Sequence, residues 1–301
     1  YTADETNYSI YSAWQQKLHR FSWYLGLRAE YNTMKLNSYT TDATNPPMDD
    51  DKVNYENPML FFSPSLAVGY DINEKMKIKF NFGRTYDKPQ FREIAPYAFY
   101  DYEAKAVIIG NPDLQNATIN HFNLRYEYYF SMDELFSFDV FYKTFQNAIE
   151  YKIIPAGTGL QYSYQNVPNA TAIGVETEIH KKILPWMFAI ANVSMINSNV
   201  MFKNESIEND RMLQGQSPYV VNGGLFFQFD SLDLQASILY NVFGKRITFV
   251  GDPYTNNPDI YELPYHNLKI NISKTFAKKF MIDFQINNIL GGSKEFIQIE
   301  Q

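Results

Sequence analysis

The chain has 301 residues, of which 17% are aromatic and 20% charged, with a formal net charge of −7 and no cysteine. This length allows one large domain or two ordinary ones, and the lack of cysteine excludes disulfides and thiolate metal sites. The acidic balance argues against a nucleic-acid partner, and the sequence holds no apolar run of about 18 residues that would predict a transmembrane helix.

Alternation of apolar and polar residues predicts β-strands along the whole chain. In residues 65–82, bulky apolar side chains occupy every second position on both sides of a short polar turn at 71–75. Because successive side chains of a strand point to opposite faces, this segment is a predicted hairpin with one apolar and one polar face. About twelve strands are predicted, near residues 6–17, 20–36, 58–72, 75–86, 117–131, 134–151, 161–181, 185–200, 217–230, 231–249, 263–276 and 279–290.

The connections between these strands alternate in length. Tight turns at 17–20, 71–75, 131–134, 181–185, 229–232 and 277–279 alternate with long polar loops near 37–57, 87–116, 152–160, 201–216 and 250–262. Short turns at one end and long loops at the other are typical of outer-membrane barrels, in which strands of about ten residues cross the bilayer. A soluble all-β fold would show turn signals every 8–12 residues or so. The sequence therefore predicts an all-β protein, an antiparallel transmembrane β-barrel.

Two further features fit a barrel. A charge that faces lipid at the bilayer midplane costs about 2–4 kcal/mol for Lys or Arg, so the charged faces of the strands are expected to line the lumen. The predicted lumenal residues are Arg28, Glu30, Lys77, Lys79, Arg125, Glu127, Asp139, Glu176, Glu178 and Asp283. Trp14, Trp23 and Trp186 flank tight turns, and tryptophan prefers the headgroup level of a bilayer. We expect these three residues in one layer near the short-turn end.

Several segments resemble the barrel of TonB-dependent outer-membrane receptors of the Bacteroidetes type. They are residues 83–97 (GRTYDKPQFREIAPY), 110–114 (GNPDL), 141–149 (FYKTFQNAI), 169–176 (NATAIGVE), 215–224 (GQSPYVVNGG) and 240–247 (YNVFGKRI). Each segment alone is a weak signal, but their order from about residue 58 to 290 matches that of the family. Gly110 and Asn111-Pro112 suit a turn that leads into the next strand.

The resemblance implies that residues 1–301 are one partial barrel domain. The family's barrel has 22 strands, and neither its N-terminal plug nor its TonB-contacting segment has a counterpart in this chain, which opens at Tyr1 without a signal-peptide pattern. Barrels of the family end in an aromatic-terminated strand, whereas residues 293–301 trail off. We therefore expect the strand near 6–17 not to pair with the strand near 279–290, because both would adjoin strands outside the chain.

The sequence lacks the motifs of common enzyme and metal sites. The four histidines, His19, His121, His180 and His266, lack metal-ligand spacing. The run Asp49-Asp50-Asp51 lacks the spaced ligands and glycine of a calcium loop. No GxSxG elbow occurs, and Gly157-Thr-Gly159 has no following helix that would cradle a phosphate. We expect no metal, no cofactor and no catalytic residue.

What remains is a capture surface on the long loops. Their aromatic residues, which suit stacking and hydrogen bonding to sugars, peptides or chelates, are Tyr39, Tyr97, Phe99, Tyr100, Tyr102, Tyr254 and Tyr261. By resemblance, the protein would take up a scarce nutrient, whether a metal chelate, an oligosaccharide or a peptide, in the outer membrane of a Gram-negative bacterium. Its partners would be membrane lipid, the TonB complex acting through a plug, and a surface lipoprotein. The alternative is a structural or adhesive barrel within a larger surface or secretion assembly.

Overall fold

The structure is a computed structural model of the chain. It describes residues 2–39, 52–102, 106–154, 161–201, 211–251 and 257–298. Strands account for nearly all of the regular structure in these ranges. The elements are β1 (Thr2–Leu18), β2 (Phe21–Tyr39), β3 (Lys52–Asp71), β4 (Met76–Asp87), α1 (Phe91–Ile94), β5 (Ala98–Asp101), β6 (Ala106–Ile109), β7 (Ala117–Tyr129), β8 (Leu135–Ile154), β9 (Gln161–Leu184), β10 (Met187–Met201), β11 (Tyr219–Phe229), the 3₁₀ turn η2 (Asp230–Leu232), β12 (Leu234–Phe243), β13 (Arg246–Phe249), β14 (Ile260–Glu262), β15 (Tyr265–Phe276), β16 (Phe280–Ile286) and β17 (Phe296–Gln298). Within the described ranges, no helix is long and apolar enough to cross a bilayer.

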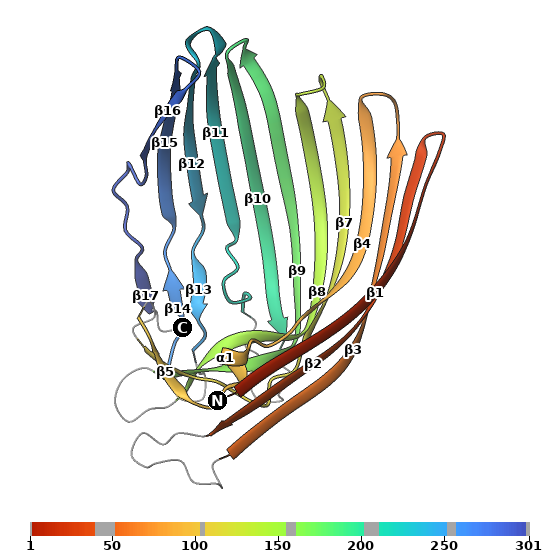
Figure 1. Cartoon of the computed structure of the whole chain (residues 1–301), viewed down its shortest axis with the longest axis vertical. Coiled ribbons are helices and arrows are strands. Elements are labelled where there is room, and N and C mark those ends of the chain that lie inside the picture. The colour runs from red at the N-terminus through yellow and green to blue at the C-terminus, as the bar shows by residue number, and fades with distance from the viewer. Residues whose placement is uncertain are drawn as a thin grey trace.

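Twelve of these strands form one curved wall (Figure 1). They follow the order β1-β2-β3-β4-β7-β8-β9-β10-β11-β12-β15-β16, and each is antiparallel to its neighbours in the wall. Among the described residues, β1 pairs only with β2 and β16 only with β15. The prediction that the first and last strands do not pair is confirmed, and the wall has two free edges.

The register separates charged from apolar side chains as the sequence predicts. Lys79 lies opposite Arg125, and Arg125 lies opposite Asp139. The register of the remaining strands continues this pattern across the wall. All of the predicted lumenal charges lie on one face, and Phe80, Phe138 and Phe284 lie on the other. The prediction that the charges share the face opposite these phenylalanines is confirmed.

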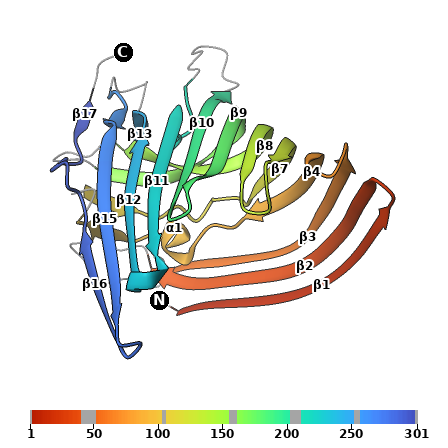
Figure 2. The same cartoon turned by 90° about the horizontal axis from the view of Figure 1, so that it is seen from above.

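The charged face is the concave one. Leu36 lies on the same face of β2 as Arg28 and Glu30, and it packs against Ile94 of α1. Figure 2 shows α1 on the concave side of the wall. Bulky apolar side chains such as Leu25, Leu60 and Phe62 remain exposed on the opposite, convex face. This is the arrangement of a wall whose outside meets lipid and whose inside is polar.

The tight turns gather at one end of the wall (Figure 1). Trp14 and Trp23 lie beside the β1–β2 turn, with ring centroids 6.0 Å apart. Trp186 lies in the β9–β10 turn, where its ring stacks on Phe229 at 5.3 Å. The prediction that the tryptophans lie at the short-turn end is confirmed.

Two predicted strands are shorter in the structure. The segment 231–249 divides into β12 and β13, with Gly244 and Lys245 between them. An added Cβ at Gly244 would lie 2.9 Å from Pro218 and 2.8 Å from Tyr219. The last wall strand ends at Ile286, and the chain returns to structure as β17, which pairs with β14. The sheet β13-β14-β17 therefore continues the wall beyond a break at the long-loop end.

The long-loop end carries a folded cap, which we define as residues 88–102, 106–116, 148–154 and 161–167. It contains α1, β5, β6 and the tip of the β8–β9 hairpin, and β6 runs parallel to the tip at Val107 and Gln161. The cap packs on the end of β2 through one buried cluster, made of Met34, Leu36, Ile94, Ala95, Ala106, Ile108, Leu114, Ile153, Tyr162 and Tyr164.

The β8–β9 hairpin bends where its tip enters the cap. Asn147 has a left-handed backbone, with φ 56°, and Pro168 on the facing strand has no N–H to donate. The two residues interrupt a ladder that pairs Gln146 with Asn169 and Ala148 with Val167. Beyond this bend, Lys152 forms a bridge to Val250 after β13. The tip therefore spans from the β2 side of the wall to β13.

Candidate functional site

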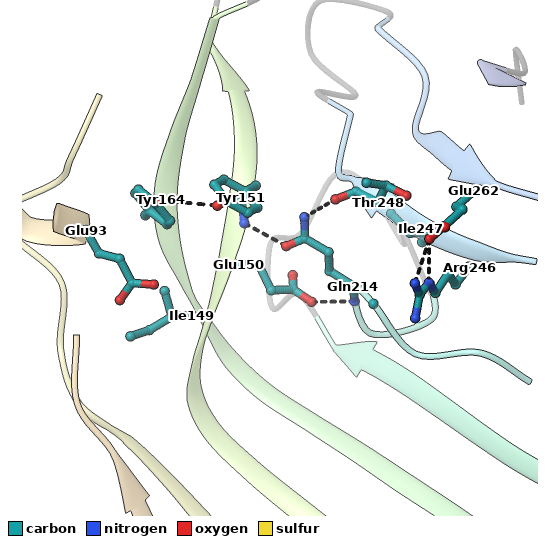
Figure 3. Close-up of a pocket in the computed structure, with 11 residues that line it drawn as sticks. Glu93, Ile149, Glu150, Tyr151, Tyr164, Gln214, Arg246, Ile247, Thr248 and Glu262 are labelled. Carbon is teal, nitrogen blue, oxygen red and sulfur yellow. Dashed lines mark hydrogen bonds and ion pairs between the residues drawn. The ribbon is translucent and has the colours of Figure 1, made fainter. Parts of the chain in front are cut away.

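A cavity of about 330 Å³ lies where the cap meets the 211–218 loop and the β13–β14 hairpin (Figure 3). One side is formed by Glu93 of α1 and by the β8–β9 tip, which contributes Tyr151 and Tyr164. The other side is formed by Thr248 of β13 and Glu262 of β14. The cavity thus draws its lining from segments that are remote in sequence.

Gln214 holds the three segments together. Its side-chain oxygen accepts a hydrogen bond from the backbone N–H of Tyr151 at 2.7 Å, and its side-chain nitrogen donates to the backbone carbonyl of Thr248. Its own backbone N–H donates to Oε1 of Glu150 at 2.9 Å. The side chain of Gln214 therefore links the β8–β9 tip to β13.

Two of the three carboxylates that line the cavity are paired with arginines. Arg246 donates from Nε to Oε2 of Glu262 at 2.8 Å, and Glu262 is 4% exposed. Arg211 donates to both carboxylate oxygens of Glu150, which is also buried. Buried carboxylates need such partners, because an unpaired buried charge is strongly destabilising.

Two polar atoms of the lining have no hydrogen-bond partner among the described residues. They are Oε1 of Glu262 and Oγ1 of Thr248, and both are buried. Both atoms are covered by protein, so neither faces the open space of the cavity.

Aromatic rings form the opposite wall. The rings of Tyr151 and Tyr164 lie 4.7 Å apart, and the Tyr164 hydroxyl donates to the Tyr151 oxygen at 3.3 Å. Burial raises the pKa of the Tyr164 hydroxyl and that of Tyr162, the latter to about 12. These phenols therefore stay protonated and act as neutral donors. Burial also raises the pKa of the Glu93 carboxyl, although the backbone N–H of Gln90 opposes the change.

The segment 110–114 holds the α1 side of the cavity in place. A Cβ at Gly110 would lie 2.2 Å from the carbonyl oxygen of Ala95, so only glycine allows this close approach. Asn111 donates from its backbone to the carbonyl of Glu93 at 2.6 Å and from its side chain to the carbonyl of Tyr164 at 3.0 Å. Its side-chain oxygen also accepts from the N–H of Asp113, which closes a turn. The sequence predicts this turn, but not its contacts with the cavity walls.

A second set of charges lies on the concave face of β4, β7, β8 and β9. Arg125 donates to Glu127 at 3.0 Å, to Asp139 at 2.7 Å and to Glu178 at 3.1 Å. Lys79 adds a bond to Glu127 at 2.8 Å. This network fixes the side chains of four adjacent strands and leaves a polar lumenal surface.

The aromatic residues predicted as substrate-facing are distributed over the loop end. Tyr97 and Phe99 pack against the buried cluster of the cap, and the guanidinium of Arg92 lies 3.6 Å from the Phe99 ring centroid. Tyr100 and Tyr102 are exposed and in contact, with ring centroids 5.1 Å apart. Tyr261 lies under Lys245, whose Nζ is 4.6 Å from its ring centroid.

None of these five lines the cavity. The Tyr39 side chain and Tyr254 lie outside the described residues. The cavity tyrosines, Tyr151 and Tyr164, lie within the predicted strands 134–151 and 161–181, so they were not counted among the aromatic residues of the loops. The signal that leads to the site is the resemblance itself, because the segments 215–224 and 240–247 supply Gly215, Arg246 and Ile247 to the lining.

The structure brings together no metal-binding cluster of His, Asp and Glu within its described ranges. His121 bonds to Thr85, His180 to Glu178 and His266 to Tyr240. His19 occupies the β1–β2 turn. Asp49-Asp50-Asp51 and Gly157-Thr-Gly159 lie outside the described residues.

Comparison with known proteins gives one family and a set of similar folds. The profile described as "Outer membrane protein beta-barrel family" matches residues 1–301. A ferric enterobactin receptor mutant from Pseudomonas aeruginosa has 16% sequence identity and a TM-score of 0.59, over 96% of this chain and 49% of that one. The copper transporter OprC has 14% identity and a TM-score of 0.73, over 98% of this chain and 43% of that one.

The ferric yersiniabactin uptake receptor FyuA from Yersinia pestis has 16% identity and a TM-score of 0.66, over 96% of this chain and 41% of that one. At these identities the likeness is one of fold. The chain spans about half the length of each of these structures. No curated protein matches the sequence.

Proposed function

The chain belongs to the outer membrane protein β-barrel family, and on this premise we propose that it is part of a receptor that takes up a scarce nutrient across the outer membrane. The observation that carries this proposal is the cap, which folds over the concave side of the wall and borders an open cavity at the long-loop end. In outer-membrane barrels the long loops are extracellular, so the cavity is where a nutrient arriving from outside would first bind.

The proposed receptor is larger than this chain. An unpaired backbone group in hydrocarbon costs several kcal/mol, so the free edges of β1 and β16 require further strands. The matched structures, about twice as long as this chain, and the resemblance to TonB-dependent receptors support a 22-stranded barrel with a plug. Binding would occur at the cap, and passage would require the plug to move with energy relayed through TonB. Nothing in this scheme changes the nutrient covalently.

The test is growth of a strain that lacks the gene. The strain is supplied with single defined sources of iron, glycan or peptide, and it is complemented with the full-length gene or with a version lacking the TonB-contacting segment. We expect a growth defect on one nutrient that only the intact gene corrects. Normal growth on every source, together with loss of cell adhesion or of a surface assembly, would contradict uptake and favour a structural barrel.

A surface lipoprotein partner is a separate proposal that rests on the resemblance alone. It predicts that a lipoprotein co-purifies with the affinity-tagged full-length receptor from detergent-solubilised outer membranes. Recovery of the receptor without any lipoprotein would contradict it.

A further inference from the structure

We propose that Arg84, on the convex face of the wall, binds a phosphate group of an outer-leaflet lipid, the lipid A anchor of lipopolysaccharide. Arg84 lies near the end of β4 and is exposed. The inference concerns the outside of the wall, so it depends neither on the ligand of the cap nor on uptake.

Arg84 lies where the apolar band of the convex face ends. The convex positions of β4 are Met76, Ile78, Phe80 and Phe82, and the next one is Arg84. A strand rises about 3.3 Å per residue, so the segment from Met76 to Arg84 spans about 26 Å along the strand, or about 20 Å of depth at a tilt of roughly 40°. The apolar band of an outer-membrane barrel is about 25 Å tall. Arg84 is therefore close to the edge of the band at the long-loop end.

A row of aromatic side chains marks the same edge on β4, β7 and β8, which are neighbours in the wall (Figure 1). Phe82 lies opposite Phe122, and Phe122 lies opposite Tyr142. The ring centroids of these two pairs are 5.1 Å and 6.2 Å apart. Because aromatic girdles flank the apolar band of an outer-membrane barrel at both interfaces, this row places the next convex residue, Arg84, at the level of the lipid headgroups.

A chain of polar side chains orients Arg84. Its Nε donates to Oδ1 of Asn120 at 2.8 Å, and Nδ2 of Asn120 donates to Oγ1 of Thr144 at 3.0 Å. The terminal nitrogens of Arg84 bond to none of the described residues, and no carboxylate among those residues pairs with it. Lys35, on the same face and at the same end of the wall, does have such a partner, Glu56 at 2.9 Å. Arg84 is thus a fixed cation whose terminal donors face away from protein carboxylates.

The anion that fits this cation is a lipid phosphate. The planar fork of a guanidinium matches the oxygens of a phosphate, which it binds through two parallel N–H bonds. The long loops of an outer-membrane barrel are extracellular, so Arg84 faces the outer leaflet. The lipid of that leaflet is lipopolysaccharide, whose lipid A carries phosphate at the junction of its acyl chains and its sugars. With the phosphate on Arg84, the acyl chains lie against the aromatic row, in which Phe122 and Tyr142 are exposed.

The experiment uses the purified full-length receptor in detergent, and native mass spectrometry measures its affinity for lipid A. Two forms of lipid A with the same acyl chains are compared, one phosphorylated and one dephosphorylated. Arg84→Gln should weaken binding of the phosphorylated form about fivefold, the contribution of one basic residue beside anionic lipid, and should leave binding of the dephosphorylated form unchanged. Arg84→Lys keeps the charge but loses the fork, so it should weaken binding less than Arg84→Gln.

The matched control is Lys35→Gln, which removes a paired cation of the same face and should change neither affinity. The inference is overturned if the wild-type receptor binds both forms equally, if Arg84→Gln leaves the preference for the phosphorylated form intact, or if it weakens both forms alike. Inorganic phosphate at the same concentration should not compete, because only the lipid also packs on the aromatic row. Competition by inorganic phosphate would indicate a site for the free ion and would overturn the assignment to a lipid.

Discussion

The lumenal network around Arg125 gives the sharpest test of the fold. Arg125→Met would remove three hydrogen bonds to carboxylates, at 2.7–3.1 Å. Removing one partner of a buried ion pair costs about 3–5 kcal/mol, because the charge left behind is uncompensated. Two of the three carboxylates have other support. Glu127 keeps Lys79 at 2.8 Å, and Glu178, with its side chain 31% exposed, keeps His180.

The cost therefore falls on Asp139. Its side chain is 5% exposed and, among the described residues, would retain only the amide of Asn123 at 3.0 Å. We expect Arg125→Met to lower the free energy of unfolding by about 3 kcal/mol, the lower end of that range. The double variant Arg125→Met/Asp139→Asn should recover most of the loss, because it also removes the uncompensated charge.

The assay is urea unfolding of the full-length receptor in lipid vesicles. Arg28→Met is the matched control, since Arg28 pairs with Glu30 at 2.8 Å but its side chain is 48% exposed. Such a pair is worth under about 1 kcal/mol. If Arg125→Met cost no more than Arg28→Met, or if the double variant were as unstable as the single one, the buried network would be refuted.

Other parts of the structure make further predictions. Folding raises the pKa of the Glu93 carboxyl, so the protonated carboxyl stabilises the cap. This stabilisation is complete below the pKa that Glu93 has in the unfolded chain, and it is lost as the pH rises through the raised pKa of the folded state. Hydrogen exchange of the cap amides should therefore speed up over that window, and a Glu93→Gln receptor that kept the same pH dependence would rule this out. Gly110→Ala should loosen the cap by about 1–3 kcal/mol through overpacking against Ala95, seen as faster proteolysis of the cap. Gly83→Ala, where an added Cβ meets nothing within 4 Å, should behave as wild type, and equal cleavage of the two variants would contradict the close approach at Gly110. Phe138→Arg should destabilise the barrel in vesicles by about 2–4 kcal/mol, whereas Asn81→Arg on the concave face should be tolerated; the reverse order would mean that the faces are assigned wrongly.

The wall could be predicted from the sequence because the structure of each hairpin depends on residues that are close together in the chain. In each hairpin the alternation of side chains fixes which face is polar, and a tight turn fixes the register. Lys79, Arg125 and Asp139 are predicted to share a face without any knowledge of how their strands pair, and the structure agrees. The break at Gly244 was not predicted, since the residues that approach it closely, Pro218 and Tyr219, are remote in sequence.

The cap and its cavity could not be predicted in the same way. The bend at Asn147 lies between the wall and the tyrosines that line the cavity. Asn adopts a left-handed backbone more readily than most residues, but an Asn within an alternating strand does not by itself predict one. The pairing of Glu150 with Arg211 joins residues 61 positions apart, which no periodic pattern reports. The sequence therefore predicts Tyr100 and Tyr102, which are exposed, as substrate-facing residues. The tyrosines that line the cavity are Tyr151 and Tyr164.

The difference between the wall and the cap also predicts the order in which they fold. Each wall strand pairs with the next wall strand along the sequence, so hairpins can form early and add to one another at a small loop-closure cost. The cap needs contacts between distant segments, such as Lys152 with Val250 and Gln214 with Tyr151. These contacts can form only after β8 to β13 have been brought into place. Folding kinetics should therefore show the wall strands protected first and the cavity assembled last, so that an incompletely inserted chain presents no binding site.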